Sequence, residues 1–333
     1  MINLKKDEMK NSDIVVSTRV RYARNLDKFK FPCIMSQKEQ NEVVDIIDKN
    51  IKKEEYKLLK LKDIDDITKR SLVEKHYISK ELIENENSAV VVNNDNSLIA
   101  MINEEDHLRI QSFGKGKCIN ECYEKLREFT DNLESKVGFA KSEDYGYLTA
   151  CPTNVGSGMR VSVIVHLEAL SKIGMVNKLL EQVRNLGISV RGFYGENTKS
   201  IANFYQISNK RTLGYTDKEI IDNFNSILLA VVEQEERARK MLLKNSIELE
   251  DDVYRSYGIL KNARKISLTE GVNLLSTLSL GMSVGVIPND VCENVYDIIE
   301  NIEPNTLRKI LKEDFEKDDE NKIRAKYIRE ELK

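Results

Sequence analysis

Glycine and proline are scarce in this chain, with 15 glycines and 4 prolines among 333 residues. Because these residues supply most sharp turns, their scarcity favours long helices. Three capping boxes, each a serine or threonine followed three residues later by a glutamate, open predicted helices at Ser36, Thr216 and Ser267. The helix from Thr216 extends to about Lys244, and the pattern beyond it is helical to the end of the chain.

The part of the chain before Lys244 has a different pattern, in which helices alternate with strands. Two apolar runs, residues 89–92 and 97–102, flank a turn of asparagine and aspartate and indicate a β-hairpin. A mixed first part and a helical last part predict two domains, residues 1–245 and 246–333. Further strands are expected at residues 14–21 and 188–190, and further helices at residues 36–51, 119–136 and 166–186, the last ending at Gly187.

Charge and cysteine content exclude several classes of protein. The 52 basic and 55 acidic residues nearly cancel, so no global positive field attracts nucleic acid or anionic lipid. The five cysteines are scattered without a C-x-x-C pair, which indicates a reducing compartment. The polar N-terminal stretch lacks the apolar region of a secretory signal, and no charge-free run has the character of a membrane span. We expect a cytoplasmic protein with no direct nucleic-acid partner and no membrane contact.

Arginines recur at strand ends in the first domain, which contains neither a P-loop nor the H-R-D and D-F-G motifs of protein kinases. In the strand at residues 14–21, two-residue alternation puts Arg19 and Arg21 on one face. The same alternation predicts that Glu105, His107 and Arg109 point in one direction. Basic groups thus gather at two separate strand ends.

Two more arginines adjoin glycine turns. Arg160 follows the turn at residues 156–158, whose backbone amides are expected to approach a phosphate closely, and Arg191 precedes Gly192. Any one of these arginines alone is most simply a solvated strand-edge residue. Several in one domain favour a triphosphate site, because guanidinium groups bind phosphate oxygens in pairs and spread positive charge over a transferring group.

Other polar residues also have a simple structural interpretation when each is considered alone. Glu104 and Glu105 fit a solvated acidic turn after the hairpin, and Cys151 fits an inert buried thiol. His76 and His107 fit structural histidines whose hydrogen bonds are satisfied within the protein, and Arg324 fits a solvated helix face.

Four motifs, taken together, resemble the catalytic domain of the phosphagen (guanidino) kinases, and they occur in the order found in that family. The N-E-E-D-H and C-P-T-N sequences within them are highly specific. The resemblance covers about residues 14–240. The motifs are S-T-R-V-R at residues 17–21, N-E-E-D-H-L-R at 103–109, C-P-T-N-V-G-S-G-M-R at 151–160 and R-G-F-Y-G-E-N-T at 191–198, with a fifth family-like stretch at 207–214.

The resemblance implies an α+β fold, in which an antiparallel sheet flanked by helices is followed by an all-helical C-terminal domain. Creatine and arginine kinases have a helical domain before the first motif, whereas only 16 residues precede Ser17 here. That arrangement, with the helical extension, is similar to the McsB-type bacterial protein arginine kinases. It implies transfer of the γ-phosphoryl group of ATP, with Mg²⁺, to arginine side chains of proteins.

The resemblance also implies roles for individual residues. Glu105 and Glu196 would hold the acceptor guanidinium, with Cys151 close to the reacting nitrogen, and Glu104 would position Mg²⁺ through water. The nucleotide-binding residues that it implies are Ser17, Thr18, Arg19, Val20, Arg21, His76, Arg109, Arg160, Val161, Ser162, Val163, Ile164, Arg191, Gly192, Phe193, Tyr194, Gly195 and Glu196.

One family feature matches only in part. The R-D-x-x-R-A pattern of a C-terminal phosphoarginine pocket corresponds to residues 320–325, where Glu320 and Asn321 replace its first two members and Arg324 is kept. The family further implies a homodimer formed through the helical C-terminal domain. Its implied partners are a McsA-type activator, a heat-shock repressor and a ClpC-type unfoldase that degrades marked proteins with its protease.

Two other functions stay open. The first is a kinase for a small guanidino compound, against which the absent front domain argues, because that domain closes over small substrates in the family. The second is a catalytically silent adaptor for arginine-rich proteins. Retention of Glu104, Glu105 and Glu196 together with the five arginines favours an enzyme, since an adaptor does not require that set.

Overall fold

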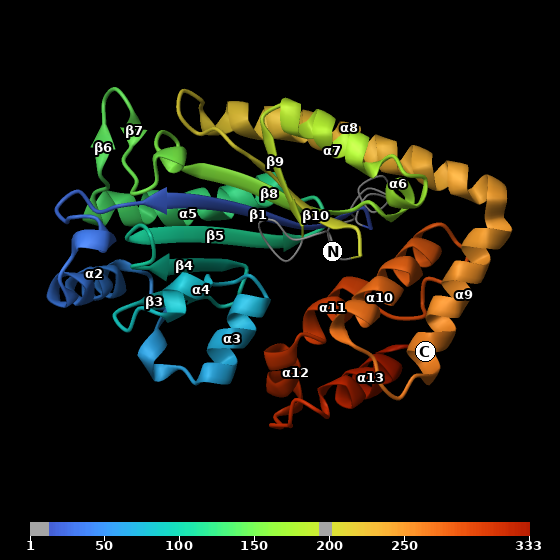
Figure 1. Cartoon of the computed structure of the whole chain (residues 1–333). Helices are drawn as coiled ribbons and strands as arrows, with labels where there is room; N and C mark the ends of the chain where they lie inside the picture. Colours follow the sequence, from blue (N-terminus) through green and yellow to red (C-terminus); the bar gives the residue numbers. More distant parts are fainter. Residues whose placement is uncertain (1–12, 193–201) are drawn as a thin grey trace.

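A computed structural model describes residues 13–192 and 202–333, and its centre is an eight-stranded sheet (Figure 1). The strand order is β2-β3-β4-β5-β1-β8-β10-β9, and every neighbouring pair is antiparallel. The strands are β1 (Val15–Arg24), β2 (Tyr56–Lys60), β3 (Ala89–Asn93), β4 (Leu98–Ile102), β5 (Leu108–Lys115), β8 (Met159–His166), β9 (Ile188–Gly192) and β10 (Phe204–Asn209), and a small hairpin pairs β6 (Lys141–Ser142) with β7 (Gly146–Tyr147).

One face of the sheet is apolar and is covered by helices. Val20, Ile110 and Val161 point to this face, where they are buried against a core that includes Leu126 and Phe224. Alternation along a strand makes such a face, because every second side chain points the same way. The covering helices are α5 (Ile119–Val137), α7 (Val176–Asn185) and α8 (Asp217–Leu242), with α2 (Gln37–Asn50) packed on α5.

The opposite face is only partly covered. Over β3 and β4 it carries a second apolar cluster, in which Ile99 and Met101 pack with Leu82 of a short helix. Met101 lies opposite Arg109 of β5, so beyond β4 this same face becomes polar. The covering helices are α3 (Asp66–Glu74) and α4 (Lys80–Ile83), and single 3-10 turns lie at Pro32–Ile34, Leu61–Asp63 and Pro152–Asn154.

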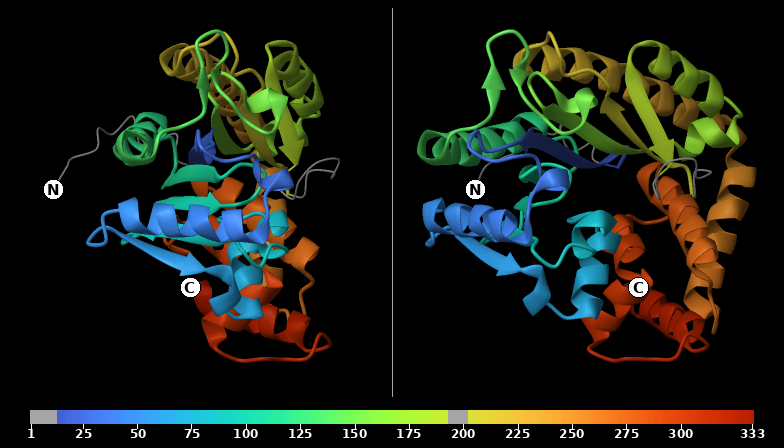
Figure 2. Two further views of the ribbon diagram at one scale, coloured as in Figure 1. Left: turned by 90° about the vertical axis from the view of Figure 1, so that its left-hand side faces the viewer. Right: turned by 60° about the vertical axis from the view of Figure 1, so that its left-hand side comes forward.

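The C-terminal helices form a separate group that returns to the sheet. Helix α8 runs along the apolar face, and after a 3-10 turn at Leu243–Asn245 the chain turns away into the next helix (Figures 1 and 2). Helix α12 then packs beside α3 of the sheet region. These C-terminal helices are α9 (Ser246–Asn262), α10 (Leu268–Ser283), α11 (Val295–Asn301), α12 (Pro304–Leu311) and α13 (Glu320–Glu331).

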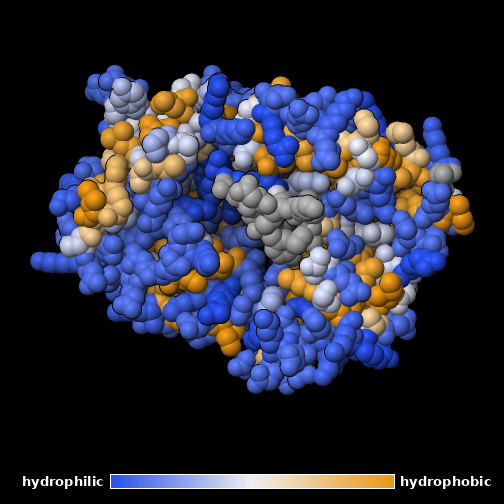
Figure 3. Space-filling view, viewed as in Figure 1, coloured by the Kyte–Doolittle hydropathy of each residue, from blue (hydrophilic) through white to orange (hydrophobic). Residues whose placement is uncertain are grey.

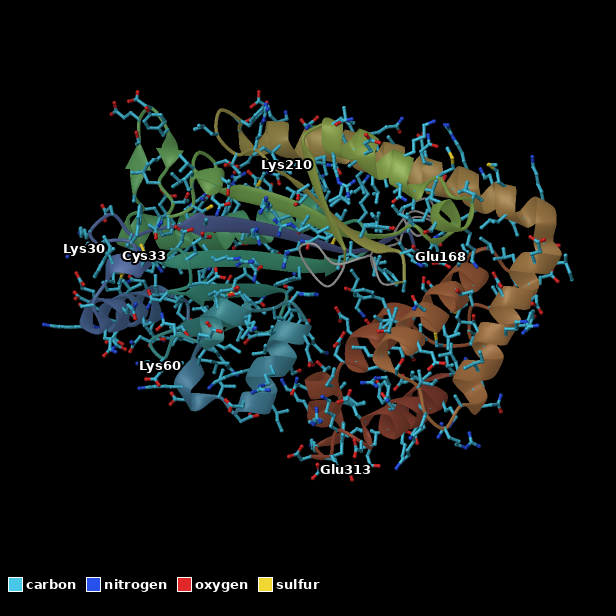
Figure 4. All side chains as sticks on the ribbon, in the orientation of Figure 1. Lys30, Cys33, Lys60, Glu168, Lys210 and Glu313 are labelled. Carbon is cyan, nitrogen blue, oxygen red and sulfur yellow. The ribbon has the colours of Figure 1, made fainter. Side chains whose placement is uncertain are left out.

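A buried polar network also joins the two groups. Ser276 of α10 donates to Glu168 of α6 (Glu168–Lys172) over 2.9 Å, and Asn203 donates to the same carboxylate over 2.6 Å. Glu168, labelled in Figure 4, lies where α6 approaches the C-terminal helices. His166 hydrogen-bonds Ser276 over 2.7 Å, so a strand end and a distant helix share one network.

Most local predictions are confirmed. All three capping boxes form, and Asn96 in the hairpin turn is left-handed at φ 57°. The prediction of one helix over residues 166–186 is wrong. Strand β8 continues to His166, and Gly174, at φ 73°, separates two shorter helices. A left-handed residue ends a helical turn, so the continuous apolar pattern belongs to two helices.

The face of the molecule drawn in Figure 3 is mainly hydrophilic, with apolar side chains gathered at a few places. Figure 3 shows apolar atoms at the edge where α8 meets α9. Met241, Leu243 and Ile247 lie there and are exposed. Within residues 13–192 and 202–333, no helix has the length and apolar character needed to cross a membrane.

Candidate active site

Strand register brings five arginines to one face of the sheet. Directly paired residues share a face. Arg21 of β1 lies opposite Arg160 of β8, and Arg109 of β5 lies opposite Ala23, two positions along β1 from Arg21. Arg191 of β9 shares this face through Gln206 of β10, which pairs with Ile164. We call this set the arginine cluster: Arg19, Arg21, Arg109, Arg160 and Arg191.

The charges of the arginine cluster repel one another. Burial and the neighbouring Arg109 and Arg160 lower the pKa of Arg19 to about 9. Burial, Arg109 and Arg19 likewise hold the pKa of Arg21 well below its usual value. Arg19 and Arg160 donate to neutral oxygens of Ser162 and Asn209, over 3.4 and 3.2 Å. A concentration of like charge suits a ligand with several negative charges, because such a ligand relieves the repulsion.

Acidic groups border the arginine cluster at the strand end of β5. Glu104 accepts from Nη1 of Arg109 over 2.7 Å, and its side chain is 6% exposed. Burial opposes ionisation of Glu104, but Arg109, Ser79 and Arg21 outweigh it and lower the pKa of this carboxyl. Glu105 is exposed, and both glutamates line a small cleft with Arg21, Arg109 and Asn154. The cleft thus joins carboxylates to the basic cluster.

The prediction that Glu105, His107 and Arg109 point one way is wrong. Asn103 is left-handed at φ 62°, so residues 103–107 form a turn before β5 begins at Leu108. His107 is fully buried, and its Nδ1 accepts from the backbone N–H of Leu26. Strand alternation does not apply to a turn, and the interpretation of His107 as a structural histidine fits its contacts.

Asp106 and Asn25 anchor this acidic turn through contacts that no sequence pattern indicated. Asp106 Oδ1 accepts from the Asn25 side chain and from the backbone N–H of Ala150, each over 2.6 Å. Asn25 in turn accepts from the His107 N–H over 2.8 Å. The bond to Ala150 connects the acidic turn to the segment that enters the C-P-T-N motif. Asp106 stands within the N-E-E-D-H motif, whereas Asn25 lies outside all of the motifs.

The C-P-T-N segment lies beside the cleft. Cys151 is partly exposed, its Sγ lies 3.0 Å from Oγ1 of Thr153, and Asn154 lines the cleft where Cys151 does not. The glycines at 156 and 158 were expected to bring backbone amides close to a phosphate, but their close contacts give them a simpler structural role. A Cβ at Gly156 would lie 2.6 Å from the carbonyl of Thr212, and one at Gly158 would lie 2.8 Å from that of Ala23. These glycines allow the turn to pack against its own chain.

A cavity of about 270 Å³ opens at the Arg19 end of the arginine cluster. His76 lines it in a left-handed conformation, and burial with Arg19 nearby lowers the pKa of this histidine to about 4, so it is neutral at pH 7. Thr18 also lines it, while its hydroxyl donates to Gly116 over 2.6 Å. Of the predicted nucleotide-binding residues, the cavity brings together Ser17, Thr18, Arg19, His76, Ser162, Val163 and Ile164.

Four of the predicted nucleotide-binding side chains lie on the other face: Thr18 and Val163, which pair with each other across β1 and β8, lie there together with Val20 and Val161. Val20 and Val161 are fully buried in the apolar core and pair with each other across β1 and β8. A ligand on the arginine face could reach only their backbone, because they alternate with Arg19, Arg21 and Arg160. Arg191 and Gly192 end β9. Phe193, Tyr194, Gly195 and Glu196 lie outside the described residues.

Arg324 lies far from the arginine cluster and is not a solvated helix residue. Its side chain is 1% exposed. It donates to the carbonyls of Ile302 and Ile266 over 3.0 and 3.3 Å, to Asn321 over 2.7 Å, and to the carboxylate of Glu320. These contacts tie α13 to the preceding helices. The first position of the R-D-x-x-R-A pattern is thus Glu320 in this chain, and its carboxylate pairs with Arg324.

The described residues hold no group of three or more histidine, cysteine, aspartate or glutamate side chains suited to a metal ion. Mg²⁺ usually binds through one or two carboxylates, several waters and the phosphates of a substrate. An ionised Glu104 beside a basic cluster fits that mode, because the phosphates would supply the other ligands.

Comparison with known families assigns both parts of the chain. Residues 38–238 match the family described as ATP:guanido phosphotransferase, C-terminal catalytic domain. Residues 246–333 match the family described as protein-arginine kinase McsB C-terminal domain. Together these matches cover the C-terminal helices and the sheet region except β1, which precedes residue 38.

Relatives that match this chain over nearly its whole length are named protein-arginine kinases. A protein-arginine kinase of Clostridium acetobutylicum is 39% identical, with 100% of both chains covered. Those of Bacillus licheniformis and Halothermothrix orenii are 38% and 40% identical, covering 99% and 96% of this chain and 93% of each relative.

Solved structures agree on the fold of the sheet region. The duplicated taurocyamine kinase of Schistosoma mansoni, with bound transition state analogue components, is 30% identical with a TM-score of 0.62, over 67% of this chain and 33% of that chain. A lombricine kinase is 23% identical with a TM-score of 0.61, over 71% of this chain and 68% of that chain, and supports the fold alone.

Proposed function

The chain belongs to the protein-arginine kinases of the ATP:guanido phosphotransferase family, and we propose that its arginine cluster binds the phosphates of ATP while Glu105 and Glu196 hold the acceptor arginine. The enzyme transfers a phosphoryl group from ATP to arginine side chains of proteins. The observation that supports this assignment of roles is the register that gathers five arginines on one sheet face beside the Glu104 and Glu105 turn.

The chemistry requires the guanidinium to become a nucleophile. An arginine side chain is a poor nucleophile because its pKa lies above about 12 and its charge is delocalised. Glu105 and Glu196 would orient the group and hold its charge on the nitrogens that do not react. As the nitrogen–phosphorus bond forms and the bond to ADP breaks, one carboxylate accepts the proton that the reacting nitrogen loses.

The arginine cluster supplies the complementary electrostatics. Five guanidinium groups would neutralise the phosphates and hold the γ-phosphoryl group in line with the acceptor. Mg²⁺, bound to the phosphates and positioned by Glu104, would add charge neutralisation when present. The nucleoside would occupy the cavity lined by Arg19 and His76. Catalysis on this account is positioning together with charge stabilisation.

The division of roles is tested by comparing substitutions at the two ends of the site. Glu105→Gln and Glu196→Gln are expected to lower kcat by about 10²- to 10⁴-fold, with an unchanged Kd for ATP in calorimetry. Arg191→Ala is expected to weaken ATP binding. The exposed Glu143, changed to Gln, is the matched control. Equal loss of ATP binding in Glu105→Gln would overturn its assignment to the acceptor.

Finer features of the biology are proposed on family membership alone. We expect residues 1–245 and 246–333 to be separate domains, a homodimer formed through the latter, and a cytoplasmic location. A McsA-type activator, a heat-shock repressor and a ClpC-type unfoldase are the proposed partners. Light scattering of the purified chain tests the dimer. Incubation with Mg-ATP and either casein or free arginine tests the protein substrate. Acid-labile, base-stable phosphate on casein supports it, and such phosphate on free arginine alone contradicts it.

A further inference from the structure

The cavity beside Arg19 has walls from two distant parts of the chain. The sheet region supplies Tyr77 and Phe113, whose rings contact each other at a centroid distance of 5.2 Å. Helix α11 and its N-cap supply Asn294, Tyr296, Asp297 and Glu300. The family model for the catalytic domain matches only as far as residue 238, so this second wall belongs to the C-terminal helices.

The two walls of this cavity differ in charge. Arg19 of the arginine cluster lines the sheet side, close to Tyr296, which opposes the lowering of the Arg19 pKa. At the α11 wall, Lys115 forms an ion pair with Asp297 over 2.7 Å. Burial raises the pKa of Glu300, and the nearby Lys75 opposes that rise. Lys115 and Lys75 are thus matched by acids of α11, whereas Arg19 is surrounded by other arginines and keeps positive charge on the sheet side.

A nucleotide has the same polarity, with a charged phosphate end and a neutral nucleoside end. Aromatic rings stack on bases, and carboxylates accept hydrogen bonds from hydroxyl and amino groups. We propose that α11 forms the nucleoside wall of the ATP site, with Tyr296 against the base and Asp297 and Glu300 as acceptors for nucleoside hydroxyl or amino groups. The inference rests on the proposed function of the arginine cluster and extends it to the C-terminal helices.

The position of this wall depends on a contact between α3 and the C-terminal helices. Glu74, at the end of α3, accepts from the backbone N–H groups of Asn305 and Thr306 over 3.0 and 2.7 Å, and also from both of their side chains. Lys75 donates to Asn301 of α11 over 3.2 Å. Glu74 is therefore a positioning residue, which acts on the nucleoside wall without lining the cavity.

The test compares ATP with inorganic tripolyphosphate, which has the phosphates but no nucleoside. Calorimetry on the full chain is expected to show Tyr296→Ala weakening ATP binding by about tenfold or more, with tripolyphosphate binding unchanged. The double variant Asp297→Asn with Glu300→Gln, and Glu74→Gln, are expected to act in the same selective way. Arg19→Gln should weaken the binding of both ATP and tripolyphosphate. Tyr254→Ala and Glu293→Gln, exposed and outside the cavity, are matched controls.

The outcomes separate the two proposals. If Tyr296→Ala and the double acidic variant leave ATP binding unchanged while Arg19→Gln weakens it, α11 is not the nucleoside wall and the arginine cluster keeps its role. If Arg19→Gln leaves both ligands unchanged, the proposed function of the cluster fails first. Melting curves without ligand show whether each variant folds. Should Tyr296→Ala be unfolded, Tyr296→Leu removes the ring at similar bulk, and unchanged ATP binding there overturns the inference.

Discussion

Two regions of this molecule hold arginines that are shielded from solvent, and their surroundings differ: Arg19 and Arg21 are partly buried on the sheet face, whereas Arg324 is fully buried among the C-terminal helices. In the arginine cluster, Arg19 and Arg21 are held near other arginines, and the pKa of each is lowered. In the C-terminal helices, Arg324 is held by two carbonyls, an amide oxygen and the Glu320 carboxylate. Burial alone is therefore no sign of function. An arginine whose neighbours repel it is poised for a ligand, whereas one whose hydrogen bonds are satisfied within the protein stabilises the fold.

The largest expected effect comes from the cluster. Arg21→Gln is expected to lower kcat/KM for a protein substrate by about 10³-fold or more, since an arginine that stabilises transferring phosphate contributes about 10³- to 10⁵-fold. Its melting temperature should stay equal or rise, because the substitution removes repulsion with Arg109 and Arg19. An assay of phosphoryl transfer from ATP to casein and a thermal melt measure the two quantities. A rate within tenfold of the parent would remove Arg21 from the site.

The opposite pattern is expected for Arg324. Arg324→Ala should destabilise the chain by about 3–5 kcal/mol, because it leaves Glu320 and two carbonyls without their donor. The kinase rate per folded molecule should change little at a temperature where the variant is folded. Urea unfolding measures the free energy, and Arg255→Ala, an exposed ion-pair partner of Asp251, is the control. A stable Arg324→Ala variant with lost activity would break the distinction between the two regions.

A smaller effect is expected where a structural contact supports the site. Asp106→Ala removes the acceptor for Asn25 and Ala150, and the resulting displacement of the acidic turn should lower kcat by about 10²-fold. The Kd for ATP should be unchanged, because Asp106 lies outside the arginine cluster. Asp106→Asn keeps an acceptor oxygen and should restore most of the rate. If Asn fails to rescue, the charge of Asp106 matters and its role is more than positioning.

The smallest effect concerns pH and the buried histidines. Burial lowers the pKa of His107 to about 4 and that of His166 to about 3, while unfolded histidine titrates near 6.5. Between those values the unfolded chain binds more protons, so stability falls as pH decreases below about 6.5, by about 1.4 kcal/mol per pH unit for each histidine.

Urea unfolding at pH 7.5, 6.0 and 5.0 measures this slope. The variant His166→Gln should show a shallower decline than the parent, which separates the histidine from titrating carboxylates. Identical slopes in the two proteins would show that His166 does not contribute to the acid sensitivity.

Local structure followed from the sequence wherever neighbouring residues control it. The capping boxes at Ser36, Thr216 and Ser267 form as predicted, because a cap depends on residues only three positions apart. The helix expected over residues 166–186 failed at Gly174, and the alternation expected for Glu105, His107 and Arg109 failed at Asn103. In both places one left-handed residue redirects the chain. The pattern of apolar and polar residues does not reveal such a change of backbone direction.

Predicting the site required both the sequence motifs and the tertiary structure. The motifs identified the arginines and the glutamates of the catalytic region, since residue type and order alone recognise the family. The convergence of Arg19, Arg109, Arg160 and Arg191 required the pairing of distant strands, and the buried contacts of Arg324 required three helices to meet. The α11 wall of the cavity comes from residues more than 250 positions after Arg19 in the chain. Periodicity reports which way a side chain points on its own element, whereas register and helix packing are long-range and arise only when the whole chain folds.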